Sequence, residues 1–104
     1  MKTQIMGSTL MTKKIKTYMG HPIVHQNRRV VIMEVKDDDS FSLGHQLVLW
    51  DKQTDLPVGW ADQLDDATYR GFAVYGPHKL SFDGETLSEL ASNGLYQFKW
   101  SMKN

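Results

Sequence analysis

Three apolar segments separated by short acidic turns constrain the fold of this chain more than any other feature. The segments are 29–36, 41–50 and 56–61. Residues 30–35 are mostly β-branched, which favours a strand, and the other two segments alternate apolar and polar side chains. Their connections, 37–40 and 51–55, are rich in Asp, Ser and Thr, whose side chains can hydrogen-bond to nearby backbone. The pattern therefore predicts a three-stranded antiparallel meander.

Strict alternation also predicts which side chains of the meander share a face, because successive side chains of a strand point to opposite sides. It places Leu56, Val58 and Trp60 together, and it places Trp50 on the same face of the second hairpin as Trp60. Pro57 lacks a backbone N–H. We therefore expect the segment 56–61 to be an edge strand or to begin irregularly.

The segments on either side of the meander are shorter. Residues 13–19 alternate, which predicts a short edge strand that ends at 20–22 and whose lysines discourage edge-to-edge pairing. The segment 62–70 is compatible with a short helix, since Trp60, Leu64 and Ala67 follow helical spacing, and equally with a loop. Two further strands are expected at 71–75 and 78–82, joined by a turn at 76–77.

A helix start is encoded near the C-terminus. Thr86 is followed three residues later by Glu89, the capping-box pattern, and Gly94 can supply a left-handed helix end. These features predict a short helix over 86–92, and the alternative is a hairpin through the Asn-Gly pair at 93–94. Residues 95–100 then alternate aromatic and other side chains, which predicts a closing strand.

Together these elements predict a mainly β fold, α+β at the margin. We expect a twisted antiparallel sheet, or a small partly open barrel, with one or two short helices. A chain of 104 residues corresponds to one domain. Residues 1–11 show no periodicity and are interpreted as a flexible tail, so the domain spans 12–104.

The composition removes several classes of function. The chain has no cysteine, which excludes a disulfide scaffold, a thiol nucleophile and a thiolate metal site. No apolar run is long enough to cross a membrane as a helix, and residues 1–10 lack the apolar core of a secretory signal. We therefore expect a cytoplasmic protein without a membrane partner.

Charge is balanced in total but uneven along the chain. Residues 1–36 carry seven basic side chains and one acidic, whereas residues 37–104 carry five basic and eleven acidic. One interpretation is a basic surface left for contact with an anionic partner. The other is that the basic third pairs with the acidic remainder, within one chain or between two copies.

The histidines give no pattern that is typical of catalysis or metal binding. His21 and His25 are four residues apart, but the extended segment between them separates their side chains too far for one ion. His45, between Leu43 and Leu47 on the apolar face of a predicted strand, is interpreted as a satisfied core or rim histidine. We expect no enzyme activity, no cofactor and no metal, because no nucleophile elbow or ligand motif is present.

The sequence therefore favours a small non-enzymatic binding or interaction domain, with a protein partner or self-association. One alternative is a small barrel that binds single-stranded nucleic acid, with lysines and arginines along the phosphates and aromatic rings stacked on bases. Another is a ligand pocket or hydrolase centred on His45. The candidate contact residues are Lys13, Lys14, Lys16, Tyr18, Arg28, Arg29, His45 and Trp50.

Overall fold

The structure is a computed structural model that describes residues 15–36, 40–75 and 78–103. The predicted tail at 1–11, together with Lys13 and Lys14, lies outside the described residues, and so do most of the predicted turn at 37–40 and all of the turn at 76–77. The backbone of the remaining chain allows the predicted elements to be compared with the observed ones.

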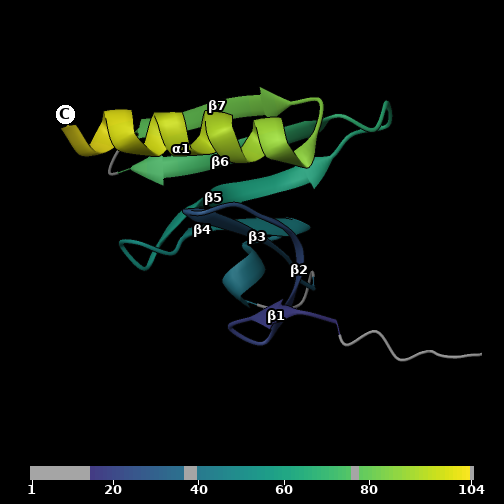
Figure 1. Cartoon of the computed structure of the whole chain (residues 1–104). Helices are drawn as coiled ribbons and strands as arrows, with labels where there is room; N and C mark the ends of the chain where they lie inside the picture. The colour runs from purple at the N-terminus through teal and green to yellow at the C-terminus, as the bar shows by residue number, and fades with distance from the viewer. Residues whose placement is uncertain (1–14, 37–39, 76–77, 104) are drawn as a thin grey trace, which may run out of the picture.

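Seven antiparallel strands form one open sheet, in which each strand lies beside its neighbours in the sequence (Figure 1). The strands are β1 (Thr17–Tyr18), β2 (His21–Gln26), β3 (Val30–Glu34), β4 (Leu47–Asp51), β5 (Leu56–Gln63), β6 (Tyr69–Tyr75) and β7 (His78–Gly84). Within the described residues, one α-helix, α1 (Leu87–Lys103), follows β7, and a 3-10 helix, η2 (Ser40–Ser42), precedes β4. The predicted mainly β antiparallel sheet is confirmed, and it takes the open form.

The larger core lies between the sheet and α1, which crosses one face of the sheet (Figure 1). Leu87, Leu90, Ala91, Gly94 and Phe98 follow the i, i+3, i+4, i+7 spacing that turns one side of a helix toward a core. This core contains Val30, Ile32, Leu47, Leu49, Val58, Ala61, Ala73, Phe82, Leu90, Ala91 and Phe98. Fully burying one such aliphatic side chain contributes about 2 kcal/mol, so this layer is the main source of stability.

A second core covers the opposite face of β3 and β4. It contains Val31, Met33, Val35 and Val48, with Tyr18, Ile23, Phe41, Trp50 and Trp60 packed against it. The indole N–H of Trp60 donates a hydrogen bond of 2.9 Å to the carbonyl oxygen of Phe41, which holds the segment around η2 against the sheet. The prediction that Trp50 and Trp60 share a face is confirmed.

The C-terminal predictions were right about where the helix begins and wrong about where it ends. Thr86 and Glu89 occupy the expected cap, since the Thr86 Oγ1 accepts a hydrogen bond of 3.1 Å from the backbone N–H of Glu89. The helix then continues through Gly94 to Lys103, so the predicted helix end, the alternative hairpin and the strand at 95–100 are all wrong. Gly94 has a packing role instead, because a Cβ there would lie 2.9 Å from the Phe82 ring and 3.1 Å from Leu49.

The predicted strand 41–50 is only half correct. Its first part forms η2 and a turn, and the strand begins at Leu47. Leu43 has a φ of 49° and is mostly exposed, so it does not share an apolar face with Leu47 as alternation implied. His45 accordingly lies in a turn and not on the apolar face of a strand.

The third meander strand is central and not at an edge, because β5 pairs with both β4 and β6. The irregularity expected at Pro57 is present. The pairing passes from Leu49 opposite Gly59 to Trp50 opposite Pro57, which leaves Val58 as the extra residue of a bulge. Val58 therefore packs under α1, whereas Trp60 packs in the second core, and the prediction that they share a face was wrong.

Two boundary predictions are resolved by strand pairing. β5 and β6 pair as far as Gln63 opposite Tyr69, so the segment 62–70 is the end of a hairpin and its turn, and the alternative of a helix was wrong. At the N-terminus the short strand β1 lies at the edge as expected, but 20–22 does not end strand structure. His21 begins β2 and pairs with Tyr18.

Candidate interaction surface

The end of β4 contains a buried ion pair between Arg29 and Asp51. Arg29 Nε and Nη2 donate hydrogen bonds of 2.9 Å to Asp51 Oδ1 and Oδ2, and the Asp51 side chain is fully buried. Thr54 Oγ1 and the backbone N–H of Gln53 also donate to this carboxylate, at 2.7 and 3.0 Å. Burial raises the pKa of Asp51, but these hydrogen bonds outweigh it and lower the pKa to about 2. The hydrogen bond that Arg29 donates to Asp51 raises the pKa of Arg29.

An open hollow of about 600 Å³ lies beside this ion pair. Its described lining residues are Arg28, Arg29, Lys52, Gln53, Leu95 and Lys99. Four of these six side chains are cationic and none is acidic. We call this site the basic hollow. Because Asp51 offsets the charge of Arg29, the hollow presents mainly the charges of Arg28, Lys52 and Lys99.

Two tight turns hold the cations of the basic hollow in place. The side chain of Asn27 accepts hydrogen bonds of 2.8 Å from the backbone N–H groups of Arg29 and Val30, which shapes the turn that carries Arg28. The backbone N–H of Lys52 donates to the carbonyl oxygen of Arg29 at 2.8 Å, and its Nζ donates to Gln26 Oε1 at 3.2 Å. The two turns are therefore joined before any partner arrives.

Two large aromatic side chains are exposed on the same stretch of α1. Tyr96 is 68% exposed and Trp100 is 51% exposed, although both occupy the helix that closes the core. They are four residues apart, and Lys99 lies between them in the sequence, so all three are neighbours on the helix surface. Tyr96 and Trp100, which we call the aromatic patch, lie on the same turns of α1 as Leu95 and Lys99 of the basic hollow.

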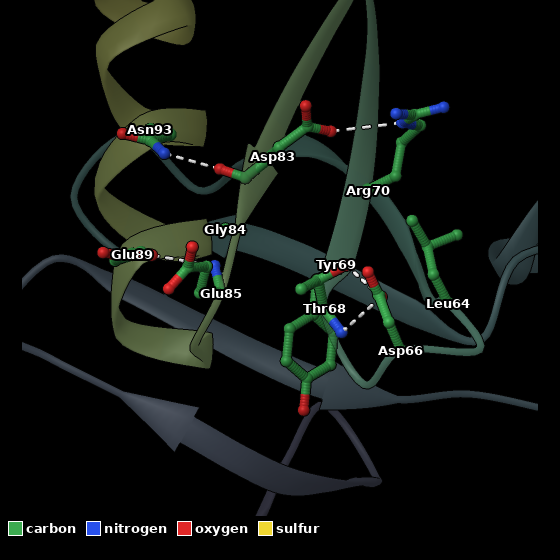
Figure 2. A pocket seen from close by; sticks show the side chains of 10 residues that line it. All are labelled: Leu64, Asp66, Thr68, Tyr69, Arg70, Asp83, Gly84, Glu85, Glu89 and Asn93. Atoms are coloured by element: carbon green, nitrogen blue, oxygen red, sulfur yellow. Dashed lines mark hydrogen bonds and ion pairs between the residues drawn. The ribbon is translucent and has the colours of Figure 1, made fainter.

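A second hollow, of about 430 Å³, has the opposite charge (Figure 2). It is formed by the β5–β6 turn, the ends of β6 and β7 that meet there, and the first turns of α1. Its described lining residues are Leu64, Asp66, Thr68, Tyr69, Arg70, Asp83, Gly84, Glu85, Glu89 and Asn93. Four carboxylates stand against one guanidinium. We call this site the acidic hollow.

Hydrogen bonds fix the walls of the acidic hollow (Figure 2). Arg70 Nε donates to Asp83 Oδ1 at 3.2 Å, and Asn93 Nδ2 donates to the carbonyl oxygen of Asp83. Glu89 Oε1 accepts a bond of 2.8 Å from the backbone N–H of Glu85. Asp66 accepts hydrogen bonds from the side chain and backbone of Thr68, and these lower its pKa.

His45 is held by a carboxylate from a neighbouring strand. Its Nδ1 lies 2.7 Å from Asp62 Oδ2, and Asp62 Oδ1 accepts a hydrogen bond of 2.9 Å from the backbone N–H of Gln46. The imidazole lies 5.4 Å from the ring of Phe72. The arrangement fastens the turn before β4 to β5, and a structural role accounts for every one of these contacts.

The sequence-predicted contact residues that the structure describes do not form one site. Arg28 and Arg29 line one hollow, and Arg29 is paired internally, which is the second of the two charge interpretations. Lys16 is exposed and Tyr18 packs on the second core, both at the β1 end of the sheet. Trp50 is half-buried in that core and donates to Asp55 Oδ1 at 3.0 Å, so its ring is not presented as a stacking platform.

Lys52, Lys99, Tyr96 and Trp100 were not among the contact residues predicted from the sequence. The lysines lie in the part of the chain that is acidic in sum, and the aromatic residues were assigned, with Phe98, to one face of a predicted strand. Helical periodicity over 95–100 places Phe98 on the opposite side of the helix from Tyr96 and Trp100. This periodicity was the sequence signal that could have identified the two exposed aromatic side chains.

Comparison of the chain with models of protein families, with curated proteins and with solved structures finds no match. No helix within the described residues is long and apolar enough to cross a membrane. In the same part of the chain, no group of three His, Asp or Glu side chains is arranged to hold a metal ion. Inference about function therefore rests on the two hollows and the aromatic patch.

Proposed function

We propose that this protein is a small non-enzymatic interaction domain, and that the basic hollow with the aromatic patch is its contact surface. The partner it suits carries clustered anionic groups beside apolar side chains. The observation that carries the proposal is the lining of the basic hollow, where four cations meet without a carboxylate among the described lining residues.

Physical chemistry supports such a surface as a binding site rather than a structural one. Like charges held close together repel each other, so a cluster of cations gains electrostatic free energy when an anionic group approaches. Exposed Tyr and Trp side chains add apolar area and are enriched where proteins contact partners. The two turns that carry Arg28 and Lys52 are already joined, so little conformational entropy is lost on binding.

The proposal is tested with a fluorescein-labelled oligoglutamate peptide, whose binding is followed by fluorescence anisotropy. We expect binding at about 0.01 M ionic strength that weakens toward 0.15 M, because screening shortens the reach of the charges. Arg28→Glu and Lys99→Glu should each weaken binding by roughly fivefold or more. Lys16→Glu makes the same charge change at the other end of the sheet and should leave binding within twofold of the wild type, taking about twofold as the margin for a distant exposed charge. Equal effects of all three substitutions would contradict the proposal.

A single-stranded nucleic acid is the alternative partner for the same surface. The observation in its favour is the grouping of Tyr96, Lys99 and Trp100 on α1, which combines aromatic rings for stacking with a charge that can bind phosphate. Zero net charge and the acidic hollow on the same molecule speak against it. An oligothymidylate titration separates the two partners. Binding to it that exceeds binding to oligoglutamate, and that Trp100→Ala abolishes, would replace the proposed partner with nucleic acid.

A further inference from the structure

We propose that the anionic partner is a second copy of this chain, whose acidic hollow docks on the basic hollow of the first. This inference rests on the proposed function, because it names the partner of the same surface. It adds a second contact region, the acidic hollow, to which the proposed function assigns no role.

The two hollows carry complementary charge. The basic hollow presents Arg28, Lys52 and Lys99 around an ion pair that is already neutral, and the acidic hollow presents four carboxylates against Arg70 alone. The basic hollow of one copy therefore attracts the acidic hollow of another copy, whereas two basic or two acidic hollows repel each other. The zero net charge of the chain leaves no overall repulsion between copies to oppose this contact.

The two hollows lie at different positions along α1. Glu89 and Asn93 of the first turns line the acidic hollow, whereas Leu95 and Lys99 of later turns line the basic hollow. Glu89 and Lys99 are ten residues apart, which is about 15 Å along a helix. Because a rigid helix separates the two sites, one copy cannot satisfy its own cations with its own acidic hollow, and a second copy can.

Both surfaces also carry apolar area near their charges. Tyr96 and Trp100 lie on the same turns of α1 as Lys99 of the basic hollow, and Leu64, which is 39% exposed, lines the acidic hollow together with Tyr69. Contacts of this mixed kind are typical of protein interfaces, where apolar anchors lie inside a polar rim. Docking of unlike sites is heterologous, so it produces a closed ring or an open chain unless a two-fold axis relates the copies.

Sedimentation velocity tests the inference. We expect the wild type to form dimers or larger species at about 0.01 M ionic strength and to dissociate as ionic strength rises. Lys99→Glu reverses one of the three main charges of the basic hollow, and Glu85→Lys reverses one of the four charges of the acidic hollow without removing the cap, because Glu85 contributes its backbone N–H there. Each variant alone should be monomeric. Lys16→Glu and Glu34→Lys, at exposed positions outside both hollows, are the matched controls and should associate like the wild type.

Mixing the two monomeric variants provides the decisive measurement. Lys99→Glu keeps an intact acidic hollow and Glu85→Lys keeps an intact basic hollow, so the mixture should form a one-to-one complex. A mixture that stays monomeric, or a wild type that is monomeric under all conditions, would overturn self-docking. If oligoglutamate still binds to the basic hollow in that case, the proposed function stands and only the identity of the partner is wrong. If oligoglutamate also fails to bind, both proposals fail.

Discussion

Asp51 is fully buried and its carboxylate receives two hydrogen bonds of 2.9 Å from the guanidinium of Arg29. The two residues are 22 positions apart, and the pair joins the start of β3 to the end of β4. Thr54 and the backbone of Gln53 complete the shell around the carboxylate. Arg29, which was predicted from the sequence to contact a partner, is thus part of the framework that positions Arg28 and Lys52.

Asp51→Asn should lower the free energy of unfolding by roughly 3 kcal/mol, because the partly buried guanidinium of Arg29 loses its counter-charge. Urea denaturation followed by tryptophan fluorescence measures the change. Asp65→Asn, an exposed aspartate in the β5–β6 turn, is the control and should change stability by less than about 0.5 kcal/mol. A similar loss in both variants would contradict a specific contribution of the Arg29–Asp51 ion pair to the free energy of unfolding.

The stability of the protein should fall in acid because of the same carboxylate. The pKa of Asp51 is about 2 in the folded chain against 3.8 for an ordinary aspartate, so the unfolded state takes up its proton first as the pH falls. The contribution of this group, about 2 kcal/mol, is complete above the unfolded-state pKa and is lost between about pH 4 and pH 2. Denaturation curves across this range measure it. The Asp51→Asn variant should lack this component, and an unchanged acid dependence in the variant would rule out Asp51 as its source.

Gly71 of β6 lies directly opposite Phe82 of β7, and the Phe82 ring occupies the space where a Gly71 side chain would stand. Gly71→Ala should therefore cost roughly 2 kcal/mol through overpacking, despite the lower strand propensity of glycine. Thermal unfolding followed by circular dichroism measures the cost.

A double variant identifies the cause of that cost. Phe82→Leu removes the aromatic ring, so Gly71→Ala should cost less than about 1 kcal/mol in a Phe82→Leu background. Equal costs in the two backgrounds would mean that the glycine is required for its backbone conformation and not for the ring above it.

Thr86→Ala should destabilise the protein by about 1 kcal/mol, because the backbone N–H of Glu89 loses its acceptor at the start of α1. Ser88→Ala, in the same turn but outside the cap, is expected to change stability by less than about 0.5 kcal/mol. Chemical denaturation compares the two variants. A larger effect of the Ser88 substitution would contradict the assignment of Thr86 as the cap.

Asp62→Ala should loosen the turn before β4, because both His45 Nδ1 and the backbone N–H of Gln46 lose their acceptor. The cost is roughly 1 kcal/mol, and amide exchange at Gln46 should become faster. His45→Ala keeps the bond from Gln46 to Asp62 and should leave that exchange rate nearly unchanged. Faster exchange in the His45 variant alone would assign the anchoring to the imidazole ring.

Local sequence patterns predicted the parts of the fold that depend on interactions between residues a few positions apart in the chain. The β-branched run at 30–34 became β3, and the polar turn at 51–55 separates β4 from β5 as expected. Thr86 and Glu89 predicted the start of α1 because a helix cap is closed by residues three positions apart. Mainly β class and antiparallel order follow from the same short-range signals.

Other features depended on residues that are distant in the sequence. The local sequence around Gly94 predicted a helix end, yet the helix continues through this residue. A glycine is required there because only a glycine lets α1 approach Phe82 and Leu49 so closely. The bulge at Val58 interrupts the alternation on which Val58 was predicted to share a face with Trp60. Lys52 joins the turn of Arg28 through the pairing of β3 with β4, and Lys99 joins them only once α1 has folded back over the sheet.

The sequence by itself therefore determined β3, β6, β7, the turn at 51–55 and the first turn of the helix, since these are set by hydrogen bonds and side-chain spacing within a few residues. The tertiary structure alone decided the length of α1, the pairing of Arg29 with Asp51 and the separation of charge into two hollows. The physical reason is that close packing and electrostatic attraction depend on distance in space, and the chain reaches those distances only after the sheet and helix have come together.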